Sequence, residues 1–374
     1  HILVVGGGIV GASIAWHLTR HSTSPKVTIV AENVGGTATP CSFAWLNASW
    51  HNPKHYFDFR HRSMAAWRQM AETLPELAKE VRWDGSLCWD KSPQELDQYI
   101  QQHTAWGYDI HRAKCAEMAV LEPALDPSIF PDWAVRVGEE GAVEADAGAR
   151  ALVADAQKHG ARLVTASVEA LLQTGANADT DTGAALASAS VNGIITSTGE
   201  TVYADHVILA AGIGSIALGA TAGVTVPLKD PAPPGLLVHT KPIPRRILHH
   251  IVYNTQGHMR QTAVEGRILA GADFVGGDPG ADPSATARAH LETVKASFQP
   301  AERELLEFDY YTIGYRPQPL DGMPVIGDTG VEGLSLAVMH SGVTNAALVG
   351  ELLASKVLTG KEDEALKAFA LSRF

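Results

Sequence analysis

The sequence predicts an α/β protein with a doubly wound, Rossmann-type parallel sheet. The first observation is a strand–helix–strand unit over residues 2–30, in which a glycine-rich turn joins the first strand to the helix. The second is the alternation of short apolar strands with helices, which is typical of a sheet covered on both faces. The length of 374 residues fits two domains or one large one, at roughly 100–200 residues per domain.

The first elements follow from the spacing of apolar residues. Ile2–Val5 is continuously apolar and reads as a strand buried on both faces. We expect a helix over Ile9–Arg20 and a second buried strand over Val27–Val30. Apolar positions near helical spacing predict another helix over Tyr56–Glu80, whereas residues 81–140, rich in Trp, Pro and His, favour short strands and turns.

The middle of the chain alternates between the two kinds of element. Ala147–His159 is predicted as a helix that Gly160 closes, because glycine is common at helix C-termini. Strands are expected over residues 163–168 and Val202–Ala211. Residues 175–189, rich in Ala, Thr, Asp and Gly, are expected to form an exposed hairpin tip or a mobile insertion.

The last third begins with the proline-rich residues 227–234, which indicate a domain crossing. Several strands are expected over residues 236–275, and a helix over Ser284–Phe298. The remaining elements are predicted as a glycine- and proline-marked loop over 314–333, a strand over Leu334–Val338 and a helix over Val343–Leu358.

Composition excludes several classes of protein. The formal charge of −12 argues against a nucleic-acid partner, which needs a basic face. No apolar run approaches the ~18 residues of a membrane span. The three cysteines are too scattered for a zinc cluster, so no metal is expected, and their odd, sparse count favours the cytoplasm or another reducing compartment. Because the chain begins at His1, directly before a strand, a trimmed targeting segment stays an open alternative.

The turn after the first strand carries a G-x-G-x-x-G pattern formed by Gly6, Gly8 and Gly11. The first glycine permits the tight turn, the second lets the backbone approach a pyrophosphate, and the third lets helix and strand pack closely. Glu32 follows Gly11 by 21 residues, where a carboxylate accepts bonds from ribose hydroxyls and repels a 2′-phosphate. The context predicts a dinucleotide site, and an incidental glycine-rich turn is the alternative.

Two further stretches fit such a site and are weaker on their own. Residues 35–39, Gly-Gly-Thr-Ala-Thr, could wrap the far side of a pyrophosphate or form a surface turn. Val207–Gly212 is an apolar strand that ends in small residues, which permit close approach of a ligand or simply tight packing.

With the loop over residues 314–327, which contains Arg316-Pro317 and Asp321-Gly322-Met323-Pro324, these features resemble the D-amino-acid oxidase-like family of flavoproteins, the group of glycine oxidase and sarcosine oxidase. The resemblance implies FAD as the cofactor and a glutathione-reductase-like FAD-binding domain interleaved with a mixed α+β substrate domain. It implies that residues 1–80, 145–226 and 314–374 bind FAD, and that residues 81–144 and 227–313 form the substrate-binding domain.

The resemblance also carries cofactor residues over to this chain. They are Gly6, Gly8, Ile9, Val10, Gly11, Glu32, Asn33, Thr37, Thr39, Val168, Ala211, Gly212, Arg316, Gly342, Val343 and Thr344. At Gly342 a helix N-terminus would face the pyrimidine end of the flavin, where its N–H groups stabilise negative charge.

Departures from the family's pattern bear on attachment and on the electron acceptor. Some relatives link the flavin to a cysteine near the terminal loop or through a histidine-linking stretch, but this chain has no cysteine after Cys115 and lacks that stretch. We therefore expect noncovalent FAD. The lysine that promotes oxygen activation in some relatives has no equivalent in Gly266–Leu269, which leaves oxygen or another electron acceptor open.

Arg316 is the first substrate candidate, because relatives place an arginine in an Arg-Pro context where its fork binds a carboxylate through two bonds. The alternative is a structural arginine that binds loop carbonyls. Tyr253, His258 and Arg260 are candidates to line the same cavity, and each also fits a scaffold role. His340 fits a place beside the flavin or a packing role under the last turn. Two tryptophans lie after the Gly-Gly stretch, in the region that relatives place near the flavin: Trp45 and Trp50.

The resemblance implies oxidation of a small amine or amino acid, with hydride transfer from the C–H bond next to nitrogen to flavin N5 and formation of an imine. Two alternatives stay open. One is another flavin reaction on the same scaffold, such as hydroxy-acid oxidation or ring desaturation. The other is a non-catalytic flavin-binding subunit. The substrate's identity and chirality and the oligomeric state are not determined by the sequence.

Overall fold

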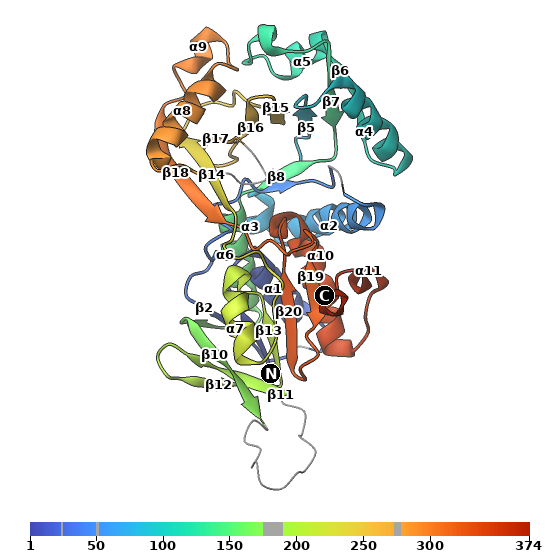
Figure 1. Ribbon diagram of the computed structural model, residues 1–374, viewed down its shortest axis with the longest axis vertical. Helices are drawn as coiled ribbons and strands as arrows, with labels where there is room; N and C mark the ends of the chain where they lie inside the picture. Colours follow the sequence, from blue (N-terminus) through green and yellow to red (C-terminus); the bar gives the residue numbers. More distant parts are fainter. Residues whose placement is uncertain (24, 50–51, 175–189, 273–277) are drawn as a thin grey trace.

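Two large sheets organise the chain in the computed structural model, which describes residues 1–23, 25–49, 52–174, 190–272 and 278–374. The first is a six-stranded sheet in the order β19-β20-β13-β1-β2-β9, in the lower half of Figure 1. Its strands are β1 (Ile2–Val5), β2 (Val27–Ala31), β9 (Arg162–Thr165), β13 (His206–Leu209), β19 (Val325–Asp328) and β20 (Leu334–Val338).

The second is an eight-stranded mixed sheet in the order β18-β14-β17-β16-β15-β5-β7-β6, in the upper half of Figure 1. Its strands are β5 (Ser86–Cys88), β6 (Ile110–Lys114), β7 (Trp133–Val137), β14 (Pro234–Thr240), β15 (Ile251–Asn254), β16 (Gly257–Gln261), β17 (Ile268–Gly271) and β18 (Phe308–Tyr315). The helices around it are α4 (Pro93–Ala105), α5 (Cys115–Leu121), α8 (Pro283–Lys295) and α9 (Pro300–Arg303).

The other strands of the described residues form two small sheets. One joins β3 (Trp45–Leu46), β8 (Gly141–Val143) and β4 (Val81–Arg82). The other joins β10 (Val168–Thr174), β11 (Ser190–Thr196) and β12 (Thr201–Tyr203) at the lower end of Figure 1. The α/β fold with mixed sheets confirms the predicted fold class.

The register of the six-stranded sheet brings the carboxyl ends of its central strands to one edge. β1 pairs parallel to both neighbours, and Val5 lies opposite Val30 of β2 and Leu209 of β13. The segments that follow these three strands therefore leave the sheet side by side, which is where doubly wound folds bind their ligands.

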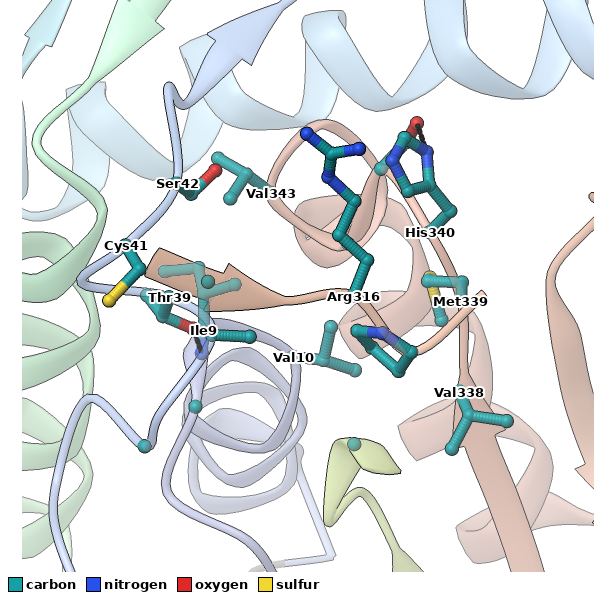
Figure 2. Close-up of a pocket in the computed structure, with 18 of the residues that line it drawn as sticks. Ile9, Val10, Thr39, Cys41, Ser42, Arg316, Val338, Met339, His340 and Val343 are labelled. Atoms are coloured by element: carbon teal, nitrogen blue, oxygen red, sulfur yellow. Dashed lines mark hydrogen bonds between the residues drawn. The ribbon is translucent and has the colours of Figure 1, made fainter. Parts of the chain in front are cut away.

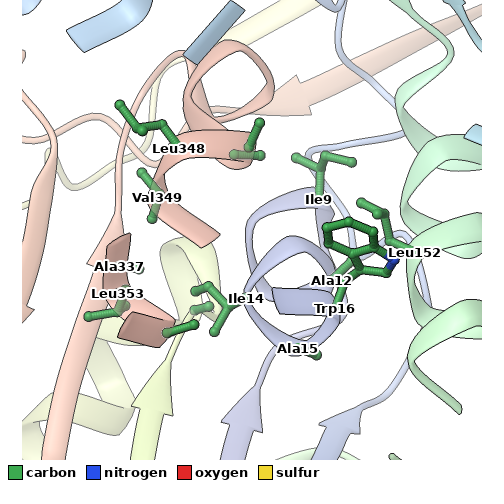
Figure 3. Packing of buried hydrophobic residues seen from close by; sticks show 14 of the residues in the cluster. Ile9, Ala12, Ile14, Ala15, Trp16, Leu152, Ala337, Leu348, Val349 and Leu353 are labelled. Carbon is green, nitrogen blue, oxygen red and sulfur yellow. The ribbon is translucent and has the colours of Figure 1, made fainter. Parts of the chain in front are cut away.

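The main core surrounds α1 (Ile9–Arg20), which lies between α6 (Ala145–Lys158) and α10 (Gly342–Thr359) (Figure 3). Small residues on α1 permit the close approach, and Leu348 and Leu353 of α10 and Leu152 of α6 are buried against it. Polar contacts fix the register of α1 and α6, because Trp16 Nε1 donates to Asp155 at 2.9 Å. Residues from both ends of the chain thus share one core.

The helix expected over Tyr56–Glu80 is divided in two. α2 (Lys54–Thr73) ends before Pro75, which begins the short α3 (Pro75–Ala78). Leu74 has the extended conformation that a following proline favours, with φ −123° and ψ 96°.

The prediction of only strands and turns over 81–140 is wrong, because α4 and α5 lie within this segment. α4 has a capping box in which Ser92 and Glu95 bind each other's backbone N–H groups, and Pro93 is its first residue. That local signature outweighs a composition that favours turns.

Three other predictions are corrected in detail. Residues 163–168 contain the end of β9 and the start of β10, and Val202–Ala211 is divided between β12 and β13, each pair of strands belonging to different sheets. The loop over 314–333 contains β19, an edge strand of the first sheet. The expected hairpin tip at 175–189 lies outside the described residues. No helix in the described ranges has both the length and the hydropathy needed to cross a membrane.

Candidate active site

A cavity of about 770 Å³ begins at the carboxyl edge of the six-stranded sheet and reaches the eight-stranded sheet (Figure 2). Its volume is within the range of about 300–1,000 Å³ that ligand sites occupy. Its walls contain the turn after β1, the segment after β2, the strand end of β13, the loop after β18 and the N-terminus of α10.

The glycine turn forms one end of this cavity, where Gly6, Gly8, Ile9 and Val10 all line the wall. A Cβ atom on Gly8 would meet only Thr39 Oγ1, at 3.2 Å, and the Gly35 carbonyl oxygen, at 3.8 Å, so the turn leaves open space at this glycine. Gly11 is different, since it is not among the described lining residues and its Cβ would overlap the Gly6 carbonyl oxygen. The expectation that Gly11 contacts the cofactor is therefore corrected to a packing role.

Other residues expected to bind the cofactor also line this cavity. The lining includes Glu32, Asn33, Thr37, Thr39, Val168, Ala211 and Gly212. Thr39 has a further contact, because its Oγ1 accepts a hydrogen bond from the Ile9 N–H at 3.1 Å. This bond ties the segment after β2 to the first turn of α1.

The N-terminus of α10 forms another part of the cavity wall, where Gly342, Val343 and Thr344 are lining residues. The preceding Ser341 has a left-handed backbone with φ 48°, which turns the chain sharply into the helix. The free N–H groups of a helix's first turn carry partial positive charge. The N-termini of two helices, α1 and α10, therefore both face the cavity.

Arg60 on α2 holds this turn and was missed by the sequence reasoning. Its guanidinium donates to Ser341 Oγ at 3.0 Å and, through Nε, to the Asn47 carbonyl oxygen at 2.9 Å. Arg60 also lines the cavity. The available signal was a charged residue on the apolar face of a helix, between Tyr56 and Ser63.

Arg316 follows β18 directly and projects into the cavity from the side of the second sheet (Figure 2). Its backbone is fixed by a hydrogen bond from its N–H to the Pro233 carbonyl oxygen at 3.0 Å. Its guanidinium lies in the space between Val343 and His340. A delocalised cation with a two-pronged donor face thus lies near the expected flavin end of the cavity.

His340 lies beside Arg316 and lines the same wall. Burial lowers the pKa of His340 to about 4, and the positive charges of Arg316, Arg60 and Lys229 add to the effect. Its Nδ1 is 3.1 Å from Ser341 Oγ. The imidazole is therefore neutral at physiological pH.

Tyr253 and His258 come from the neighbouring strands β15 and β16 and line the cavity, as expected. Arg260 lies elsewhere. Its guanidinium binds Glu144 at 2.7 Å and the Phe43 carbonyl oxygen at 2.7 Å, and it is not among the described lining residues. Burial alone would raise the pKa of Glu144, but Arg260, the Ala263 N–H and Arg82 together outweigh burial and the pKa is lowered. The expectation that Arg260 lines the cavity as a substrate or catalytic residue is therefore corrected: its guanidinium forms an internal ion pair with Glu144.

Trp45 lines the cavity and is held from behind by the buried Glu140, whereas Trp50 lies outside the described residues. The Glu140 carboxylate accepts hydrogen bonds from Trp45 Nε1 at 2.9 Å, from Ser49 and Ser86 at 2.6 Å each, and from Tyr108 at 2.7 Å. Burial raises the pKa of Glu140, and these four donors oppose the shift. The network connects the cavity wall at Trp45 to the second sheet at Ser86.

These features fit FAD. A Cβ-free turn at Gly8 leaves room for a pyrophosphate, Glu32 offers a carboxylate to ribose, and the N-terminus of α10 offers N–H groups to the flavin end. No group of three or more His, Cys, Asp or Glu side chains within the described ranges is arranged to hold a metal.

The doubly wound sheet, the glycine turn and a cavity that leads from it to a second sheet define a dinucleotide-dependent enzyme. The particular family follows from comparison with known proteins: the family model "FAD dependent oxidoreductase" (DAO) matches residues 1–356, and the chain belongs to this family. It is therefore an FAD-dependent oxidoreductase, which confirms the predicted family and cofactor.

Individual relatives cover nearly the whole chain. The chain is 26% identical to an opine oxidase subunit of Agrobacterium tumefaciens (strain Ach5), over 99% of this chain and 96% of that protein. It is also 26% identical to the glycine oxidase of Bacillus licheniformis, with the same coverage. The crystal structure of glycine oxidase from Geobacillus kaustophilus superposes with a TM-score of 0.82 at 24% identity, covering 100% of this chain and 98% of that one.

Proposed function

We propose that this chain oxidises a small amine or amino acid at the carbon next to nitrogen, and that its preferred substrates carry a carboxylate. The observation that carries the proposal is the Arg316 guanidinium, which projects into the cavity near the N-terminus of α10. The similarity to an opine oxidase subunit and to glycine oxidases supports it.

We propose that the cofactor is held by the residues that the cavity wall and the family have in common. They are Gly6, Gly8, Ile9, Val10, Glu32, Asn33, Thr37, Thr39, Val168, Ala211, Gly212, Arg316, Gly342, Val343 and Thr344. Residues 1–80, 145–226 and 314–374 then form the FAD-binding domain, and residues 81–144 and 227–313 the substrate-binding domain. The six-stranded sheet, whose strands all lie in the first set, supports this division.

Bound FAD supplies the hydride acceptor. Arg316 binds the substrate carboxylate through two parallel hydrogen bonds, which orients the C–H bond next to nitrogen. His340, whose pKa is about 4, adds no positive charge beside the substrate. The N-terminus of α10 stabilises the negative charge that accumulates at the flavin end. A substrate amine that binds in its neutral form needs no protein base, and the imine product hydrolyses in water.

Anaerobic mixing with a panel of amines, amino acids and hydroxy acids tests the proposal. We expect at least one amine or amino acid to bleach the flavin absorbance, and hydroxy acids to leave it unchanged. Bleaching by hydroxy acids alone would contradict the amine assignment, and no bleaching by any compound would favour a non-catalytic subunit. Reoxidation of the bleached protein by dissolved oxygen or only by an added quinone then distinguishes an oxidase from a dehydrogenase.

A further inference from the structure

The Arg316 guanidinium lies against a strand position that has no side chain. Gly235 is the second residue of β14, is buried, and lines the cavity. A Cβ atom built on Gly235 would lie 2.9 Å from Cζ of Arg316 and 3.1 Å from its Nε, and closer still to Nη2. The nearest atoms are thus all from the planar guanidinium, so the side chain of Arg316 occupies the space that a Cβ would fill.

The backbone of Arg316 has little freedom to move away from Gly235. In the ladder between β14 and β18, Pro234 lies opposite Tyr315 and Gly235 opposite Gly314. The Arg316 N–H continues the ladder with its bond to the Pro233 carbonyl oxygen at 3.0 Å. The side chain therefore folds back over the ladder that holds its own backbone, and the missing Cβ of Gly235 admits it.

We infer that Gly235 is a positioning residue that sets the carboxylate preference of the cavity, because its missing Cβ leaves the space in which the Arg316 guanidinium lies. The inference rests on the proposed role of Arg316 in binding a substrate carboxylate. Any side chain at residue 235 displaces the fork, and a displaced fork loses the two-pronged geometry that distinguishes an anion from a neutral group.

The same geometry predicts that Gly235→Ala folds. The methyl group would meet the far end of a flexible side chain, and no backbone atom is among its three nearest neighbours. A shift of the guanidinium relieves the overlap and leaves the β14–β18 ladder intact. The substitution is thus expected to change substrate selection more than stability.

A double-mutant cycle on the holoenzyme tests the inference with four proteins: wild type, Gly235→Ala, Arg316→Ala and the double variant. The first readout is the ratio of kcat/KM for the best amino acid to that for its decarboxylated amine. The second, which needs no turnover, is the perturbation of the flavin spectrum by acetate and by acetamide.

We expect Gly235→Ala to lower the acid-to-amine ratio and weaken acetate binding by about ten- to a hundredfold, the range for a hydrogen bond to a charged group. We expect Gly235→Ala to raise KM for the amino acid more than it lowers kcat, and to leave acetamide binding unchanged. In the Arg316→Ala background, which is the matched control, the added methyl should change acetate binding less than about twofold, because coupled residues do not act additively.

Each other outcome has a defined meaning. If Arg316→Ala loses the preference for acids and Gly235→Ala keeps it, the role of Gly235 is wrong and the carboxylate role of Arg316 stands. If neither variant loses it, both the carboxylate role and the inference are wrong. Additive losses in the double variant would also overturn positioning through Arg316. If Gly235→Ala does not fold, restored folding in the double variant supports the overlap with Arg316, and a double variant that also fails to fold overturns it.

Discussion

At the scale of single residues, three positive side chains act on His340. Arg316 lies beside it, Arg60 reaches it through Ser341, and Lys229 adds to the field that lowers its pKa. Because its pKa is about 4, His340 carries no charge near pH 7. The positive charge beside it in the cavity is that of Arg316, whose guanidinium lies near Val343. The substrate end of the cavity is therefore suited to an anionic group.

Replacement of Arg316 by alanine should reduce kcat/KM for an amino-acid substrate about ten- to a hundredfold, the equivalent of about 1.5–3 kcal/mol for a hydrogen bond to a charged group. Arg316→Lys should recover only part, because an ammonium cannot reproduce the two-pronged fork. Steady-state kinetics with the acid and its methyl ester measure the effect. Equal losses for both substrates, with a lower melting temperature, would instead indicate a structural arginine.

The second residue-scale prediction concerns attachment of FAD. Cys41 is the cysteine that lines the cavity in the described part of the chain, and burial raises the pKa of its thiol. Because the thiolate is the reactive form, this cysteine is poorly suited to forming a bond to the flavin. We expect acid precipitation to leave the flavin in the supernatant. Flavin retained in the denatured pellet would contradict noncovalent binding.

At the scale of elements, the glycines of the first turn have separable roles. Gly8→Leu should give a folded, colourless protein, because its side chain would extend into the cavity at the proposed pyrophosphate position, where a Cβ meets Thr39 Oγ1 at 3.2 Å and the Gly35 carbonyl oxygen at 3.8 Å. Absorbance of the purified protein and its melting curve check both expectations.

Gly11→Ala provides the contrast, since its methyl would overlap the Gly6 carbonyl oxygen and so should lower the melting temperature directly. A folded Gly8→Leu protein that retains stoichiometric yellow flavin would show that Gly8 does not face the cofactor.

How far the sequence predicts an element depends on whether its signal is local. Ile2–Val5, Ile9–Arg20 and Leu334–Val338 agree with the structure because continuous burial or a glycine turn marks their bounds. That the segments after β1, β2, β13 and β20 line one cavity was also predictable, since they follow strand ends. Arg60 and Gly235 were not, because their roles depend on contacts with Ser341 and Arg316, which are distant in the chain.

At the scale of the whole molecule, the cavity depends on segments that meet only in the folded chain. α1 begins at residue 9 and α10 at residue 342, and the two helices pack on each other in the main core. Both helices point their N-termini at the same cavity. Cofactor binding and folding of this half are therefore coupled, and bound FAD should stabilise the fold by mass action.

The stability of the whole molecule should fall between pH 6.5 and about 4. Burial is the main cause that lowers the pKa of His17, His239 and His340 to about 4 each. In the unfolded chain a histidine titrates near 6.5. Below that value the unfolded state binds protons that the folded state excludes, so acid favours unfolding, whereas above it these histidines are neutral in both states.

Each excluded proton adds a slope of up to about 1.4 kcal/mol per pH unit within this window. Urea unfolding of the holoenzyme at pH 7, 6 and 5 measures the free energy of unfolding, which should fall progressively as the pH is lowered. His17→Gln is the variant that isolates one histidine, because His17 of α1 lies against Gly350 of α10 and is not among the described residues that line the cavity. It should reduce the slope by about the equivalent of one proton. Equal unfolding free energies at pH 7 and pH 5, with the same slope in wild type and His17→Gln, would contradict the expectation.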